Sequence, residues 1–265
     1  MSITGILIAA ACVGIVGIFV GLFLGVAGIK FKVEVDEKEE AVLAVLPGNN
    51  CGGCGFAGCS GLAAAIAKGE AAVNTCPVGG DEVGKKIAAI MGVEAGASER
   101  KVAYVHCQGD CDRTKTDYDY YGIKDCRMMS FVPGGGPKSC NSGCLGFGTC
   151  VQVCPFDAIH VENGVAVVDK EKCKACGKCV EVCPKHLISL RPYSNTVQVA
   201  CSSTDKGPVT MKACTTGCVG CGICVKNCQH DAVKVENFHA VIDPEKCVGC
   251  GACMEKCPKK CIVKA

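Results

Sequence analysis

The sequence predicts an α+β protein with an N-terminal helix followed by small cysteine-rich domains, and three observations lead to this prediction. The first is an uncharged apolar run over residues 3–29. The second is a set of 27 cysteines in 265 residues, many in the spacing Cys-x2-Cys-x2-Cys-x3-Cys-Pro that holds [4Fe–4S] clusters. The third is an internal repeat, in which residues 138–173 match residues 212–247. Together they predict one transmembrane helix, a small [4Fe–4S] domain of helices and loops, and two tandem two-cluster ferredoxin-like domains.

The apolar run over residues 3–29 is long enough to cross a bilayer, because a spanning helix needs about 20 apolar residues. A cleaved signal peptide is the alternative, but it begins with a positive segment and has an apolar region of about 7–15 residues. This chain has no Lys or Arg before Lys30. Since positive charges stay on the cytoplasmic side, Lys30 and Lys32 predict a single-pass protein of the bacterial cell membrane. The transmembrane helix would occupy residues 1–29 and contact lipid through residues 3–29, and the cysteine-rich domains would face the cytoplasm.

The first cysteine set lies in residues 30–100, which we expect to form a [4Fe–4S] domain with its linkers. Its cysteines follow the pattern Cys-x2-Cys-x4-Cys-x16-Cys-Pro: Cys51, Cys54, Cys59 and Cys76. Glycines between the first three let a tight loop wrap a cluster, and an Ala-rich helix over 61–68 leads to the fourth. A four-thiolate zinc loop is the alternative. Three thiolates crowded onto one turn disfavour zinc, so we expect a cluster.

Residues 101–139 form a cysteine-containing linking segment in this prediction. They hold Cys107, Cys111 and Cys126 and a glycine run over 133–137. That run lacks the spacing of a nucleotide-binding fingerprint, so we expect it to be a turn.

The internal repeat predicts one ferredoxin domain over 140–190 and another over 214–265, with a connector over 191–213. Each copy contains a short hairpin, at 158–168 and 232–242. In two-cluster ferredoxins the fourth cysteine of each motif binds the other cluster. This rule predicts three ligand sets: Cys154, Cys173, Cys176 and Cys179; Cys218, Cys221, Cys224 and Cys257; and Cys228, Cys247, Cys250 and Cys253.

The remaining ferredoxin site is irregular, because Phe147 stands where the second copy has Cys221. We expect Cys140 to supply the missing thiolate, and the alternative is a three-ligand or absent cluster. The expected set is Cys140, Cys144, Cys150 and Cys183. Five clusters follow, and the leftover cysteines are enough for a sixth without a defined ligand set: Cys107, Cys111, Cys126, Cys201 and Cys214. Cys12 and Cys261 are expected to be bystanders.

Composition and spacing exclude several other classes of protein. The formal net charge is +2 and the pI is about 7.7, which gives no basis for a nucleic-acid partner. Disulfides need an oxidising compartment, and disulfide frameworks do not repeat this spacing. Zinc sites use two Cys-x2-Cys pairs rather than a triplet with a remote Cys-Pro. Neither a nucleotide motif nor a catalytic residue is expected, so the chain should carry electrons without a complete active site of its own.

The layout resembles a known family. An N-terminal apolar helix, the motif CGGCGFAGC at 51–59 followed by Cys76-Pro77, and tandem ferredoxin motifs resemble the B subunits of Rnf complexes in their long form from anaerobic bacteria. Those complexes are ion-translocating ferredoxin:NAD⁺ oxidoreductases. The resemblance covers essentially the whole chain and departs from the pattern at Phe147.

The resemblance implies a role and partners. The chain would accept electrons from reduced ferredoxin or flavodoxin and relay them through its clusters toward flavin-bearing membrane subunits. Other Rnf subunits would reduce NAD⁺ and translocate Na⁺ or H⁺. The alternatives are the iron–sulfur subunit of another membrane redox complex, a reductase that resets a redox-sensing transcription factor, and a scaffold that uses clusters as structural staples.

Overall fold

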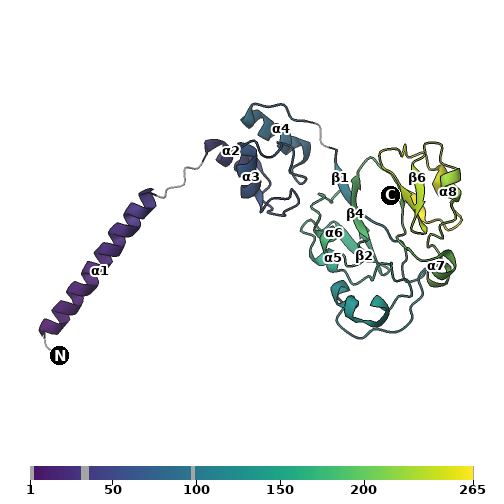
Figure 1. Cartoon of the computed structure of the whole chain (residues 1–265), viewed down its shortest axis with the longest axis horizontal. Helices are drawn as coiled ribbons and strands as arrows, with labels where there is room; N and C mark the ends of the chain where they lie inside the picture. The colour runs from purple at the N-terminus through teal and green to yellow at the C-terminus, as the bar shows by residue number, and fades with distance from the viewer. Residues whose placement is uncertain (1–2, 31–35, 97–98, 265) are drawn as a thin grey trace.

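The protein is described by a computed structural model that covers residues 3–30, 36–96 and 99–264, with the side chains of residues 3–12 and 29 left out. Figure 1 shows three parts in chain order: the long helix α1 (Ile3–Lys30), a small helical unit, and a larger unit that begins at β1. The larger unit is built from four two-stranded antiparallel sheets and short helices.

The large apolar side chains described in helix α1, from Val13 to Val26, are exposed. Phe19 is 71% exposed and Phe23 is 64% exposed. Within the described part of the chain, no helix reaches the length and apolarity that a membrane crossing needs. The predicted span over 3–29 lies partly outside the described side chains, and Lys32, which we used to predict orientation, lies outside the described residues.

The helical unit consists of α2 (Glu37–Val45), α3 (Cys59–Ala67) and α4 (Gly80–Met91). Asp36 caps α2 by accepting a hydrogen bond from the backbone N–H of Lys38 at 2.9 Å. Helix α4 ends at Gly92, whose φ of 71° is left-handed and favours glycine. The core of this unit contains the fully buried side chains of Val42 and Ile87 together with residues of α3. The helix predicted over 61–68 is therefore confirmed as part of α3.

The first ferredoxin unit contains two small sheets. Strand β1 (Lys101–Val105) pairs with β4 (Ile188–Pro192), and β2 (Ile159–Glu162) forms a hairpin with β3 (Val165–Val168). The hairpin turns at Asn163 and Gly164, both with positive φ, as a two-residue hairpin turn requires. Helices α5 (Thr149–Gln152) and α6 (Lys178–Val182) pack beside these strands. Two 3₁₀ helices, η1 (Cys126–Phe131) and η2 (Pro133–Gly135), lie between β1 and α5 in the chain.

The second ferredoxin unit repeats this plan. Strand β5 (Val197–Val199) pairs with β8 (Ile262–Lys264), and β6 (Val233–Glu236) forms a hairpin with β7 (His239–Ile242). Its helices are α7 (Gly207–Ala213), α8 (Ile223–Lys226) and α9 (Ala252–Glu255). Both hairpins predicted from the sequence are confirmed within a residue of their expected bounds.

The segments that we expected to be linkers supply the outer strands of both ferredoxin units. Strand β1 comes from the segment 101–139, and β5 comes from the connector 191–213. The partly buried His106 ring joins the two units, because it lies 3.0 Å from the carbonyl oxygen of Val199 and 2.7 Å from the hydroxyl of Ser189. Burial lowers the pKa of His106, which favours the neutral ring. The predicted domain boundaries remain a prediction.

Candidate iron–sulfur sites

All cysteines from Cys51 to Cys261 are free thiols. Among the described residues, no group of three or more His, Cys, Asp or Glu side chains is placed to hold a metal ion. A single zinc ion needs ligand atoms about 2.0–2.3 Å from one point, whereas a four-iron cube is larger and holds its thiolates farther apart. The thiols do gather into groups on that wider scale, and the groups are described in turn below.

The N-terminal set lies on the loop before α3 and the turn before α4. The side-chain oxygen of Asn50 accepts a hydrogen bond from the backbone N–H of Cys59 at 2.8 Å, which closes the loop. Cys54, Cys59 and Cys76 pack against one apolar cluster. Burial raises the pKa of the Cys76 thiol, and the nearby thiols of Cys54 and Cys59 raise it further. The fold therefore brings cysteines that are up to 22 positions apart in the sequence to one site.

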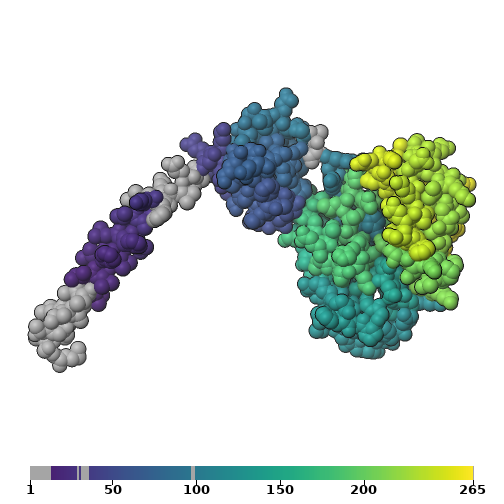
Figure 2. Space-filling view, viewed as in Figure 1, coloured from purple at the N-terminus to yellow at the C-terminus, as the bar shows by residue number. Residues whose placement is uncertain are grey.

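Gly53 places this loop against the first ferredoxin unit. A Cβ atom at Gly53 would lie 2.7 Å from the carbonyl oxygen of Cys176, closer than any side chain allows. Burial raises the pKa of Cys176, and the thiol of Cys51 contributes to the rise. Figure 2 shows the helical unit touching the surface of the first ferredoxin unit. The N-terminal thiols and the set that contains Cys176 are consequently neighbours.

Four short helices present the third cysteine of each ferredoxin motif. Each helix follows a glycine with left-handed φ, between 71° and 81°: Gly148, Gly177, Gly222 and Gly251. This conformation is unfavourable for residues with a Cβ atom, which explains the glycine in every motif. A cysteine lies in the first turn of each of these helices: Cys150, Cys179, Cys224 and Cys253.

The three regular sets predicted from the motif spacing each come together in the fold. Burial raises the pKa of Cys179 to about 12, and its neighbours contribute, among them Cys173, Cys176 and Cys154. Cys253 has raised pKa through burial, with contributions from Cys247, Cys228 and Cys250. One pocket is lined by the third set, Cys218, Cys221, Cys224 and Cys257. In each case the fourth thiol belongs to the partner motif, as the ferredoxin rule requires.

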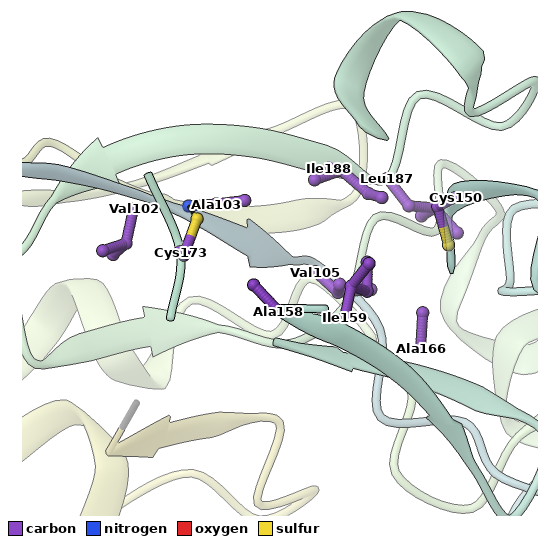
Figure 3. Close-up of a cluster of buried hydrophobic side chains, with 10 residues drawn as sticks. All are labelled: Val102, Ala103, Val105, Cys150, Ala158, Ile159, Ala166, Cys173, Leu187 and Ile188. Carbon is purple, nitrogen blue, oxygen red and sulfur yellow. Dashed lines mark hydrogen bonds between the residues drawn. The ribbon is translucent and has the colours of Figure 1, made fainter. Parts of the chain in front are cut away.

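Backbone N–H groups point at several of these sulfur atoms. The backbone nitrogen of Ala103 lies 3.4 Å from the sulfur of Cys173. Figure 3 shows the two residues beside each other in the core of the first unit. The N–H of Ala240 lies 3.4 Å from the sulfur of Cys218. Hydrogen bonds to sulfur stabilise thiolates and tune the potentials of iron–sulfur clusters. The donor pattern therefore fits cluster ligands.

At the irregular site, the structure gathers a different cysteine from the one we expected. One pocket is lined by Cys126, Cys144, Cys150 and Cys183. Cys140 is not among its lining residues. Burial raises the pKa of Cys150 to about 12, and the thiols of Cys144, Cys126 and Cys183 contribute to the rise. The structure thus places Cys126 where we had expected Cys140.

Local contacts explain how Cys126 reaches this pocket. The backbone N–H of Cys126 donates a hydrogen bond to the hydroxyl of Thr149 at 2.8 Å, at the start of α5. That hydroxyl also lies 3.1 Å from the carboxylate of Asp125, which caps η1. Because Cys126 precedes Cys144 by many residues and no motif links them, spacing alone carried no signal for this pairing.

Cys140 instead belongs to a second group, formed with cysteines that the sequence analysis assigned to no ligand set. A Cβ atom at Gly109 would lie 3.6 Å from the sulfur atoms of both Cys107 and Cys214. Burial raises the pKa of Cys140, and the thiols of Cys107 and Cys214 contribute. Burial also raises the pKa of Cys201 to about 11, with a contribution from Cys140. Four thiols from distant parts of the chain therefore meet between the two ferredoxin units.

This second group also receives backbone hydrogen bonds at sulfur. The N–H groups of Gly109 and Cys144 each lie 3.4 Å from the sulfur of Cys107. The N–H of Cys218 lies 3.2 Å from the sulfur of Cys201. The thiols of this group are therefore buried and accept backbone hydrogen bonds in the same way as thiols of the regular sets.

Three family profiles match parts of the chain. Residues 46–78 match a putative Fe-S cluster domain, and residues 172–232 and 217–261 match a 4Fe-4S dicluster domain. Residues 136–194 match the LdpA Fe-S cluster-binding domain. These matches cover every cysteine set of the regular motifs, and the chain accordingly binds multiple [4Fe–4S] clusters.

Curated relatives extend the match to nearly the full chain. One is the B subunit of the Na(+)-translocating ferredoxin:NAD(+) oxidoreductase complex of Acetobacterium woodii, 48% identical over 98% of this chain and 78% of the relative. The B subunit of the ion-translocating oxidoreductase complex of Methanosarcina acetivorans is 43% identical over 93% of both chains. The B subunit of the proton-translocating ferredoxin:NAD(+) oxidoreductase complex of Clostridium ljungdahlii is 42% identical over 86% of this chain and 81% of the relative.

The chain belongs to the family of B subunits of Rnf-type ion-translocating oxidoreductase complexes. Its family role is that of an electron-transfer subunit of an oxidoreductase, and the iron–sulfur domains fit that role. The sequence resemblance to the B subunits of Rnf complexes is therefore confirmed.

Three further cysteines of this Rnf-type chain belong to none of these sets of four. Cys261, which we expected to be a bystander, lines the same pocket as Cys218, Cys221, Cys224 and Cys257. It is 1% exposed, and its sulfur lies 3.5 Å from that of Cys257. Cys111 is exposed. The side chain of Cys12 lies outside the described residues.

The donor sets fit [4Fe–4S] clusters in their chemistry. Five groups bring four thiols together, and in the N-terminal group Cys51 lies on the same loop as Cys54 and Cys59. Several of the sulfur atoms accept hydrogen bonds from backbone N–H groups. Most of these thiols are partly or fully buried, which limits solvent access to a bound cluster. Thiolate is also the ligand that iron–sulfur clusters use in proteins.

Proposed function

We propose that this chain relays electrons inside an ion-translocating ferredoxin:NAD⁺ oxidoreductase complex. Reduced ferredoxin or flavodoxin would deliver the electrons, and other Rnf subunits in the membrane would receive them. The observation that carries the proposal is the match to the B subunits of such complexes over almost the whole chain, together with thiol groups that neighbour one another from Cys51 to Cys257. When bound, [4Fe–4S] clusters supply one-electron redox chemistry over a wide range of potentials.

The residues that hold these clusters form six proposed ligand sets. Four retain the predicted composition: Cys51, Cys54, Cys59 and Cys76; Cys154, Cys173, Cys176 and Cys179; Cys218, Cys221, Cys224 and Cys257; and Cys228, Cys247, Cys250 and Cys253. The geometry supports two more: Cys126, Cys144, Cys150 and Cys183 at the irregular site, and Cys107, Cys140, Cys201 and Cys214 between the ferredoxin units.

We also propose that α1 anchors the chain in a lipid bilayer, with the cluster domains on the cytoplasmic side. Residues 3–29 contain no charge, and the large apolar side chains described between Val13 and Val26 are exposed, which is unfavourable in water. A bilayer would cover that surface. The names of the relatives associate them with ion-translocating complexes, which supports a membrane setting.

The coupling ion is a separate question from the relay role. The relatives include one named for Na⁺ and one named for protons, at similar identity to this chain. Because both ions occur among such similar subunits, family membership is compatible with either, and the proposal covers Na⁺ or H⁺ translocation by the partner subunits.

The relay proposal is tested on the native complex. The chain carries a C-terminal tag, the complex is extracted anaerobically in mild detergent, and NAD⁺ reduction by reduced ferredoxin is measured. Activity should copurify with the tagged chain and disappear from membranes of a deletion strain. Restoring the wild-type chain should restore activity. Copurification with other partners, without this activity, would place the chain in a different redox complex.

A further inference from the structure

Lys138 is the only charged residue among the buried side chains that the structure describes. It is 8% exposed, and its ammonium group donates hydrogen bonds to the carbonyl oxygens of Gly109 at 2.9 Å and Gly164 at 2.7 Å. The ion pairs found in the described residues all involve other cations. A buried cation without a carboxylate partner therefore lies inside the first ferredoxin unit.

Such a charge needs compensation. Taking an ammonium out of water is unfavourable even after the protein relaxes, and lysine is almost never buried without a partner. Two carbonyl groups accept two of its three N–H protons, but they are dipoles and carry no net charge. An anionic group close to Lys138 would supply the compensating negative charge, which no carboxylate of the described residues provides.

Thiols of two proposed cluster sites lie near Lys138, and so does the exposed Cys111, since a Cβ atom at Gly164 would lie 2.5 Å from its sulfur and 3.7 Å from the ammonium nitrogen of Lys138. A Cβ atom at Gly109, whose carbonyl oxygen accepts from Lys138, would lie 3.6 Å from the sulfur of Cys107. Burial raises the pKa of Cys107 and of Cys144, and the positive charge of Lys138 acts on both in the opposite direction. Cys107 belongs to the site between the ferredoxin units, and Cys144 belongs to the irregular site.

We propose that Lys138 is the shared counter-ion of these two cluster sites and that its ammonium raises the reduction potentials of both clusters. Reduction takes one electron from the donor and adds one negative charge to a cluster and its four thiolates. A nearby cation stabilises the reduced form more than the oxidised form, because Coulomb attraction grows with the charge. Net charge around a cluster is one of the factors that set its potential. This inference rests on the ligand sets given under the proposed function.

The internal repeat provides a matched control. Lys212 occupies the position that corresponds to Lys138 in the second copy, but it lies exposed in the last turn of α7. A charge in water is strongly screened, so Lys212 should have little influence on any cluster. The two lysines thus differ in environment while sharing their place in the repeat.

The experiment compares Lys138→Gln and Lys212→Gln in the full chain, purified anaerobically in detergent with its clusters. Iron per chain is measured first, and midpoint potentials follow from redox titrations monitored by low-temperature EPR. We expect Lys138→Gln to keep its iron and to shift the midpoint potentials of two clusters to more negative values. Lys212→Gln should match the wild type. Unchanged potentials in an iron-replete Lys138→Gln protein would overturn the proposal.

Loss of iron in Lys138→Gln is resolved by Lys138→Arg, which keeps the positive charge. Recovery of iron and potentials in the arginine variant supports the counter-ion role, and failure to recover overturns it in favour of a purely structural role. Cys107→Ser and Cys144→Ser test the underlying ligand sets separately. Each variant should lose a different cluster. Retention of all iron in either variant would refute the ligand set that contains that cysteine, independently of the result for the Lys138 variants.

Discussion

Glycines of the N-terminal cluster loop have two distinct functions. Gly52 and Gly55 have φ values of 77° and 85° with open space around them, so their backbone conformation calls for glycine. Gly53 has no left-handed φ, and it needs to lack a side chain because the backbone of Cys176 lies against it. The close approach of two cluster loops therefore depends on a single hydrogen atom at Gly53.

We expect Gly53→Ala to keep its iron and yet transfer electrons more slowly between the N-terminal set and the set of Cys176. The added methyl group would lie 2.7 Å from a carbonyl oxygen and would push the two loops apart. The measurements are iron per chain and NAD⁺ reduction by the complex. The control is Gly61→Ala, whose added methyl group would meet nothing closer than 3.8 Å. Equal activity in both variants would contradict this interpretation of the contact.

Cys126 and Cys140 provide a second prediction for single residues. Cys126→Ser and Cys140→Ser should each remove one cluster, but different clusters, because the two thiols lie in different groups. EPR spectra of the reduced proteins measure which signal is lost. Cys126→Ser should match Cys183→Ser, and Cys140→Ser should match Cys214→Ser. If Cys140→Ser matched Cys183→Ser instead, the original sequence-based pairing would be right.

Single elements of the fold are stabilised by small apolar cores next to the thiols. In the helical unit, α3 carries Leu62, which is 1% exposed and packs in the same cluster as Cys54, Cys59 and Cys76. Helix α2 carries Leu43 on its outer side, 39% exposed. The two leucines therefore separate the contribution of the core from that of helix propensity.

Leu62→Ala should lower the free energy of unfolding of the helical unit by about 2–5 kcal/mol, because it leaves a cavity in a packed core. Leu43→Ala should change it by no more than about 0.5 kcal/mol, as for most surface substitutions. Anaerobic denaturant unfolding of the full chain, followed by circular dichroism and by cluster absorbance, measures both. A similar loss in the two variants would show that the core residue has no special role.

At the scale of the whole molecule, the chain joins an apolar helix to a series of neighbouring thiol groups. Contacts connect the N-terminal set to the set of Cys176 through Gly53, and His106 joins the two ferredoxin units. The group around Cys107 lies where both units meet, since its thiols come from both. This arrangement suits a relay, in which each carrier has a neighbour within reach.

Deletion of residues 1–35 tests the anchor. We expect the truncated chain to keep its iron, because every proposed ligand lies after residue 50, and to move from the membrane fraction to the soluble fraction. Sedimentation of cell extracts and iron analysis measure the two properties. NAD⁺ reduction by membranes should be lost with the anchor. A truncated chain that still sediments with membranes would mean that the cluster domains bind the membrane or its proteins without α1.

The local chemistry of the chain could be predicted from the sequence by itself. Motif spacing predicted the N-terminal cysteine set and the three regular ferredoxin sets, and the repeat predicted both hairpins, which the structure contains. These features depend on residues close in the chain or on an offset that spacing reveals. Left-handed glycines before Cys150 and its counterparts belong to the same local pattern. The family resemblance rested on these motifs as well.

Only the tertiary structure decided which distant groups meet. The pairing of Cys126 with Cys183 depends on η1 docking against Thr149, and the group of Cys107 and Cys214 depends on strands from the supposed linkers closing both sheets. The buried place of Lys138 depends on the same packing, since its repeat counterpart Lys212 is exposed. Motif spacing predicts ligands that lie on one loop. Ligands that packing brings together from distant segments show no regular spacing in the sequence, because many different chain paths can place a thiol at the same point.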